Sequence, residues 1–187
     1  MKLFLDSADP TQWALVPGSP RVQGVTTNPT LVRQAGLPMS LSTYRALIDQ
    51  AVDARMPELM LQLPLADVAQ ALQWAHDLSA HATLSGVTLT LKLPCHPSWE
   101  SVARALSAEG VSFLLTGVAN PVQLLWSKDL GAAYVAPYLG RLQADGRDVW
   151  PLVQASVALQ TDGPKLLAAS IRSLEMLARL IAAGAYA

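Results

Sequence analysis

A lysine stands near the end of the strongest β-strand pattern in the sequence. The run from Thr88 to Pro94 reads Thr-Leu-Thr-Leu-Lys-Leu-Pro, so Thr88, Thr90 and Lys92 share one face of a strand and the leucines share the other. Burial of an ammonium is costly unless the group is paired or neutral, and a neutral lysine amine is the nucleophile of Schiff-base chemistry. The run predicts a catalytic amine at Lys92, with a lysine on a solvated strand face as the alternative.

The composition predicts one globular domain over residues 1–187, expected in the reducing cytoplasm. The sequence has 51% hydrophobic residues and a net charge of -1, which is too neutral for electrostatic binding of nucleic acid. Charged residues interrupt the longest apolar stretch, Leu166 to Ala187, so neither a membrane anchor nor an export signal is expected. Cys95 has no cysteine partner, and the histidines lack the spacing of zinc ligands, so we expect no metal and no cofactor. These histidines are His76, His81 and His96.

Strand-like and helix-like segments alternate along the whole chain, which predicts βα units and a parallel sheet. Seven strands are expected, at residues 2–6, 24–28, 58–63, 88–93, 111–116, 134–138 and 165–170. Helices are expected at residues 40–54, 65–80, 98–108, 121–130, 148–160 and 173–183. Asp9 and Pro10 fit a helix start, and Gly110, Gly131 and Gly184 fit helix ends.

Polar residues recur at the carboxyl ends of these strands. In a parallel barrel these ends surround the active site. If Lys92 points inward, the last inward residues of the other strands are Asp6, Asn28, Gln62, Thr116, Tyr138 and Ser170. The intervening positions are apolar and suit packing against outer helices, namely Leu3, Leu5, Val25, Leu59, Leu61, Val135 and Leu139. A catalytic barrel has a reason to gather such polar groups at one mouth, whereas a structural one does not.

Five segments in register resemble the transaldolases, and most closely their small fructose-6-phosphate aldolase branch. They are LFLDSAD (residues 3–9), GVTTNPT (24–30), LKLP (91–94), YVAPYLGR (134–141) and LAASIR (167–172). The resemblance implies a (β/α)8 TIM-type barrel and a metal-free class I aldol mechanism on small sugar phosphates. It also implies a homo-oligomer.

The resemblance implies a role for each residue of the site. Lys92 matches the Schiff-base lysine, Asp6 the carboxylate that handles a substrate hydroxyl and its proton, and Thr26 and Asn28 the positions that hold ketose hydroxyls. Arg141 and Arg172, beside Ser170, match the arginines that receive phosphate, as suits guanidinium forks. The alternatives are packing or capping for Asn28 and surface ion pairs for the arginines. For Tyr138, the alternative is a core aromatic.

The resemblance also bears on the choice of reaction. Transaldolases place Glu where this chain has Gln62, whereas the aldolase branch has Gln together with Tyr at the position of Tyr138. Thr116 matches the threonine that orients a catalytic water in both branches. We therefore expect dihydroxyacetone or hydroxyacetone as donor and glyceraldehyde 3-phosphate as acceptor. Transfer of a dihydroxyacetone unit between sugar phosphates is the alternative.

The chain departs from the family pattern at its end. After the seventh strand and its helix only residues 185–187 remain, where the family continues into an eighth strand and a C-terminal helix. We therefore expect a barrel truncated before strand eight, with a catalytically impaired barrel as a second alternative. The segments LPCHP (93–97) and GVANP (117–121) also differ from the sequences that are usual in the family at these positions, which leaves the substrate preference open.

Overall fold

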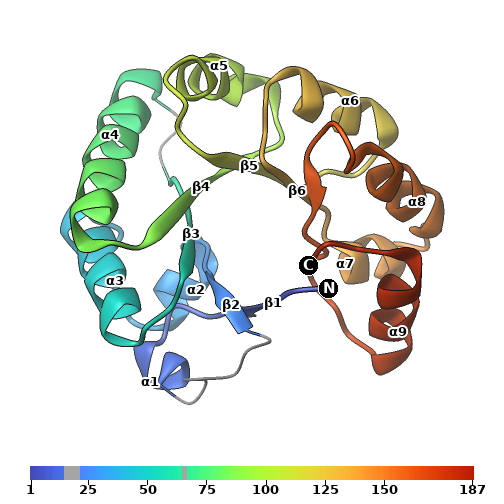
Figure 1. The fold of residues 1–187 in the computed structure, drawn as a ribbon, viewed down its shortest axis with the longest axis horizontal. Coiled ribbons are helices and arrows are strands. Elements are labelled where there is room, and N and C mark those ends of the chain that lie inside the picture. The colour runs from blue at the N-terminus through green and yellow to red at the C-terminus, as the bar shows by residue number, and fades with distance from the viewer. Residues whose placement is uncertain (15–21, 65–66) are drawn as a thin grey trace. The chain divides into compact units, whose positions relative to one another are not determined.

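The computed structural model describes residues 1–14, 22–64 and 67–187. The chain divides into two compact units. The first unit comprises Lys2–Lys92 and Ala108–Ser112, and the second comprises Leu93–Ser107 and Phe113–Ala187 together with Met1. Figure 1 shows the order of the elements along the chain.

The first unit carries four parallel strands that follow one another in the sheet in chain order. Its elements are β1 (Leu3–Asp6), α1 (Pro10–Trp13), β2 (Val22–Thr26), α2 (Pro29–Gln34), α3 (Leu41–Asp53), β3 (Glu58–Gln62), α4 (Val68–Ser85) and β4 (Thr88–Pro94). The last two residues of β4 belong to the second unit. Helices α3 and α4 pack against each other (Figure 1). No helix in the described ranges has the length and apolarity needed to cross a membrane.

The second unit continues the alternation with three more parallel strands. Its elements are a 3-10 turn at Pro97–Trp99, α5 (Glu100–Ala108, whose last residue belongs to the first unit), β5 (Phe113–Thr116), α6 (Pro121–Asp129), β6 (Tyr134–Ala136), α7 (Leu139–Ala144), α8 (Trp150–Leu159), β7 (Lys165–Leu166) and α9 (Leu174–Ala183). After α9, Ala187 donates to Leu166 O at 3.0 Å and accepts from Ala168 N at 2.8 Å, which is a parallel pairing along β7. The predicted α/β class is confirmed, with seven parallel strands in chain order among the described residues.

Several predicted boundaries were wrong, and the caps of neighbouring helices explain two of them. The second strand ends at Thr26 rather than Asn28, because Asn28 Oδ1 accepts from the backbone N–H groups of Thr30 and Leu31 and so begins α2. The fourth helix, predicted at 65–80, begins after its N-cap Asp67 and runs to Ser85. The first two residues of that prediction lie outside the described residues.

The seventh strand also differs from its prediction at 165–170. It is regular only at Lys165–Leu166, and one isolated bridge joins Tyr138 to Ala169. Ser170 has φ +61, a left-handed conformation that cannot continue a strand. Leu3, expected to pack under helices, is 41% exposed. Leu139, expected in a strand phase, is instead the first residue of α7.

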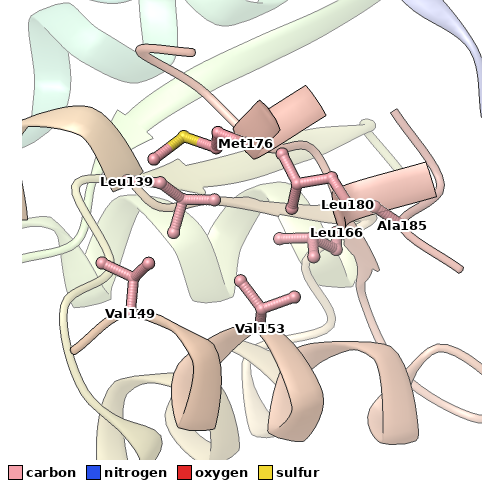
Figure 2. Packing of buried hydrophobic residues seen from close by; sticks show 7 residues of the cluster. All are labelled: Leu139, Val149, Val153, Leu166, Met176, Leu180 and Ala185. Atoms are coloured by element: carbon pink, nitrogen blue, oxygen red, sulfur yellow. The ribbon is translucent and has the colours of Figure 1, made fainter. Parts of the chain in front are cut away.

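The core of the second unit fixes the start of α7. Leu139 packs with residues of α8, β7, α9 and the chain end, and Figure 2 shows these side chains facing one another. The other members of the cluster are Val149, Val153, Leu166, Met176, Leu180 and Ala185. A buried leucine side chain contributes about 1.5–3 kcal/mol through the hydrophobic effect. The residues on either side of Leu139, Tyr138 and Gly140, are therefore held at a defined place in this unit.

Replacement of Thr27 by valine is expected to stabilise the protein. Thr27 is completely buried, and its hydroxyl has no hydrogen-bond partner among the described residues. An unpaired buried hydroxyl costs about 1–3 kcal/mol, and a methyl group in its place removes that cost at nearly the same volume. We expect Thr27→Val to raise the free energy of unfolding by about 1 kcal/mol in urea denaturation. A loss of stability would show that the hydroxyl has a partner, for example a buried water.

Candidate active site

Lys92 lies in the interior rather than on a solvated strand face. It is 5% exposed, and its neighbours Leu91 and Leu93 on the opposite strand face are fully buried. Along β4 the residues Thr90 and Lys92 alternate with these leucines, as the two-residue period predicted. In the register of the sheet Lys92 lies opposite Gln62 of β3. The alternative of a solvent-exposed lysine was therefore wrong.

Burial changes the acid–base behaviour of this amine. Desolvation lowers the pKa of Lys92 from 10.5 to about 8, while the nearby negative charge of Asp6 opposes this effect and raises it. Burial disfavours the charged ammonium, and this cost exceeds the attraction of the carboxylate. At pH 7 a pKa of about 8 leaves roughly one amine in ten neutral, against roughly one in a few thousand for an ordinary lysine. The amine is therefore available as a nucleophile near neutral pH.

Asp6 is engaged by a neighbour other than the lysine. Thr26 Oγ1 donates a hydrogen bond to Asp6 Oδ1 at 2.8 Å, and the two residues are paired in register at the ends of β1 and β2. Among the described residues no carboxylate forms an ion pair with Lys92. Because an ion pair would hold Lys92 in its charged form, this arrangement favours the neutral amine.

The two amide side chains proposed for the site have different surroundings. Gln62, at the end of β3, is partly buried opposite Lys92, and its backbone carbonyl accepts a hydrogen bond from the Tyr44 hydroxyl at 2.9 Å. Its side-chain amide forms no hydrogen bond with a described residue. The Asn28 side chain caps α2 through its oxygen, which is the structural role that the sequence left open. Only the amide nitrogen of Asn28 is left to reach a ligand.

In the second unit, two hydroxyl groups proposed for proton transfer lie together. Thr116 Oγ1 donates to the Tyr138 hydroxyl oxygen at 2.8 Å. Thr116 ends β5 and is 5% exposed, while Tyr138 follows β6 and precedes α7. Because the phenol accepts from Thr116, its own proton is free to be donated elsewhere. The pair is a short hydroxyl chain at the carboxyl ends of adjacent strands.

The two arginines proposed for phosphate binding carry unneutralised charges at the surface. Arg141 and Arg172 are exposed, and neither forms an ion pair with a carboxylate of the described residues. The alternative of surface ion pairs was therefore wrong. The Arg141 guanidinium lies over the Tyr138 ring, with Cζ 4.6 Å from the ring centroid. Two unpaired guanidinium groups are a suitable recognition element for a phosphate.

A glycine that the sequence analysis did not select brings this part of the second unit together. Gly140 N donates to Ser170 O at 3.1 Å, and a Cβ built on Gly140 would lie 2.1 Å from that oxygen and 3.0 Å from Cγ and Cδ of Arg172. Only glycine allows the start of α7 to approach the Ser170 backbone so closely. The glycine between Tyr138 and Arg141 in the YVAPYLGR segment was the available sequence signal.

The comparisons with known proteins extend over nearly the whole chain. A family model described as transaldolase/fructose-6-phosphate aldolase matches residues 3–183. The chain is similar to a probable transaldolase of Dehalococcoides mccartyi, at 31% identity over 177 residues that cover 92% of this chain and 78% of that protein. It is also similar to a probable fructose-6-phosphate aldolase of Streptococcus pneumoniae, at 28% identity over 168 residues that cover 88% and 73%. Because the family model matches residues 3–183, nearly the whole chain, the chain belongs to the transaldolase/fructose-6-phosphate aldolase family.

Proposed function

We propose that the protein is a class I aldolase that forms a Schiff base between Lys92 and dihydroxyacetone or hydroxyacetone and adds this donor to glyceraldehyde 3-phosphate. The reverse reaction would cleave fructose 6-phosphate. The observation that carries the proposal is the buried amine of Lys92, whose pKa is lowered to about 8 by desolvation although Asp6 acts against it. A buried lysine that is not held charged by an ion pair is suited to attack a carbonyl carbon.

Formation of the iminium, the first part of the donor half, is proposed to use groups of the first unit. The neutral Lys92 amine attacks the ketone carbon, and the carbonyl oxygen leaves as water to give an iminium ion. Asp6 already accepts a hydrogen bond from Thr26. It would also accept a hydrogen bond from a hydroxyl group of the ketone substrate and take up the proton of that hydroxyl. The free amide of Gln62 would hold the departing water. The iminium withdraws electrons, so the adjacent carbon loses a proton and the C–H electron pair forms the enamine double bond.

The proton leaving the donor carbon needs an acceptor, and the hydroxyl pair of the second unit is proposed for this step. Neither a phenol nor a threonine hydroxyl is a good base near neutral pH, so Tyr138 and Thr116 would act through a water molecule. The 2.8 Å hydrogen bond between them supports movement of protons along the chain. The enamine carbon then attacks the aldehyde carbon, and the aldehyde oxygen takes up a proton. Water finally hydrolyses the new iminium and frees Lys92.

The acceptor is proposed to be held by its phosphate. Arg141 and Arg172 are exposed guanidinium groups without acidic partners among the described residues, and each can donate two hydrogen bonds to phosphate oxygens. Ser170 would add a hydroxyl donor. The cationic pair thereby favours a phosphorylated aldehyde over its unphosphorylated counterpart.

The second candidate function is a transaldolase, which takes its dihydroxyacetone unit from a sugar phosphate. The names of the relatives favour it, since the similar proteins of Dehalococcoides mccartyi and of Caulobacter sp. are both called probable transaldolase. Gln62 and Tyr138 favour the aldolase, because an amide cannot serve as the carboxylic acid and base that transaldolases are expected to use at this position. The pneumococcal relative named probable fructose-6-phosphate aldolase is consistent with that choice.

Borohydride trapping is expected to place a dihydroxyacetone adduct on Lys92. The protein is incubated with dihydroxyacetone, reduced, digested and mapped by mass spectrometry. Modification is expected at Lys92 and not at Lys2, Lys128 or Lys165, because an ordinary lysine is almost fully protonated at pH 7. Absence of the Lys92 adduct would reject both enzymatic candidates. An adduct without any aldehyde-dependent product would indicate an impaired site.

The same protein preparation distinguishes the two reactions. We expect fructose 6-phosphate to form from free dihydroxyacetone and glyceraldehyde 3-phosphate. If product forms only when sedoheptulose 7-phosphate supplies the donor unit, the protein is a transaldolase. The adduct on Lys92 is expected in both cases. This experiment therefore identifies the donor substrate, whereas the trapping experiment tests whether Lys92 forms a Schiff base.

A further inference from the structure

We propose that Arg141 is a positioning residue for Tyr138, in addition to any contact that it makes with the acceptor phosphate. This inference rests on the proposed function and deepens it. It predicts that Arg141 affects the donor half of the reaction, in which no phosphate takes part. An arginine that serves only as a phosphate anchor has no influence on that half.

The contact that carries the inference lies within one short segment of the second unit. The Arg141 guanidinium carbon lies 4.6 Å from the centroid of the Tyr138 ring, within the range of an attractive cation–π interaction. On the same ring, the hydroxyl oxygen accepts from Thr116 Oγ1 at 2.8 Å. The cation therefore covers one face of a ring whose hydroxyl belongs to the proposed proton path.

The backbone around this contact is firmly placed. Arg141 N donates to Tyr138 O at 3.0 Å, so the two residues span the first turn of α7. Leu139, between them, is fully buried in the hydrophobic cluster of the second unit (Figure 2). A Cβ at Gly117 would lie 3.8 Å from Cε2 of Tyr138, so residue 117 leaves that ring edge without a side-chain contact.

This geometry gives Arg141 a role before the acceptor arrives. With its face covered by the guanidinium, the Tyr138 ring keeps its hydroxyl within hydrogen-bond distance of Thr116. Without that cover the ring can rotate about its side-chain bonds, and the hydroxyl chain spends less time assembled. Proton transfer depends steeply on such placement, so the rate of proton removal from the donor should fall even with phosphate absent.

The test measures exchange of the donor's carbon-bound hydrogen with deuterium from D2O, followed by proton NMR on dihydroxyacetone in a phosphate-free buffer. For Arg141→Met we expect the maximal exchange rate to fall about tenfold, the size of a partial loss of acid–base catalysis, with an unchanged KM for dihydroxyacetone. Arg141→Lys keeps a cation that can stack on the ring, so its maximal exchange rate should lie between those of Arg141→Met and the wild type. Circular dichroism checks that each variant is folded.

A matched control is available in the same unit. The Arg179 guanidinium carbon lies 3.6 Å from the Trp150 ring centroid, so Arg179→Met also removes a stacked arginine but is expected to exchange at the wild-type rate. The inference would be overturned if Arg141→Met exchanged at the wild-type maximal rate, including the case in which only its KM for dihydroxyacetone changed. If Arg141→Met does not fold, the same criterion applies to Arg141→Gln. An absence of exchange in the wild-type protein would instead reject the proposed function.

Discussion

Lys92→Met is expected to eliminate turnover and, at neutral pH, to make the protein more stable. Methionine retains the length of the lysine stem but cannot form an iminium ion. We expect kcat to fall by about 10⁴-fold or more, because the covalent route accounts for a large part of the rate enhancement. The side chain is 5% exposed, so methionine fills a space that is already closed to water.

The gain in stability follows from the lowered pKa of Lys92. In the folded protein this pKa is about 8, against 10.5 for an ordinary lysine. Between these two values the unfolded chain binds more protons than the folded one, so wild-type stability rises as the pH increases from about 8 to 10.5. Below pH 8 the wild type bears the full cost of burying the ammonium, about 3 kcal/mol. Methionine does not bear this cost.

Urea unfolding of both proteins at pH 7 and at pH 10 measures this difference. The stability advantage of Lys92→Met is expected to be largest at pH 7 and to shrink at pH 10. Other groups that titrate in this range are common to both proteins and cancel in the comparison. Lys165→Met is the control, because Lys165 is exposed, with its ammonium over the Tyr186 ring, and should show neither loss of turnover nor a pH-dependent difference. A less stable Lys92→Met protein would contradict the burial argument.

The sequence predicted the strands and the longer helices because their hydrophobic periods are long enough to be distinctive. Alternation along β4 placed Lys92 on the face opposite Leu91 and Leu93, and the buried position of Lys92 agrees with it. The six-residue helices α2 and α7 were missed, because so few residues do not display a helical period. The Asn–Pro pairs at residues 28–29 and 120–121 are cap signals, and both do begin helices.

Details of the site that depend on backbone geometry could not be predicted from residue types. Ser170 adopts a left-handed conformation, which glycine usually provides and which nothing in the LAASIR segment indicates. The stacking of Arg141 on Tyr138 depends on the turn between them, whereas the predicted strand ran through Tyr138. The hydrogen bond between Thr26 and Asp6 likewise follows only from the register of β1 and β2.

Gly140→Ala is expected to be strongly destabilising and to impair use of a phosphorylated acceptor. The new methyl group would lie 2.1 Å from the backbone oxygen of Ser170, well inside van der Waals contact. That oxygen has little freedom to move, because it accepts from Gly140 N at 3.1 Å while Leu139 N donates to Ala169 O at 3.0 Å. We expect the free energy of unfolding to fall by about 3 kcal/mol, at the upper end of the effects of overpacking.

The effect on function follows from the second contact of the same methyl group, which would lie 3.0 Å from Cγ and Cδ of Arg172. Displacement of this side chain should raise KM for glyceraldehyde 3-phosphate more than KM for unphosphorylated glyceraldehyde. Gly146→Ala is the matched control, since Gly146 has φ +77 but no atom within 4 Å of a built Cβ. Gly146→Ala should lower the free energy of unfolding by only about 1 kcal/mol, through backbone strain. It should leave both KM values unchanged. Because Gly140 lacks the positive φ of Gly146, equal losses of stability in the two variants would contradict the steric argument for Gly140.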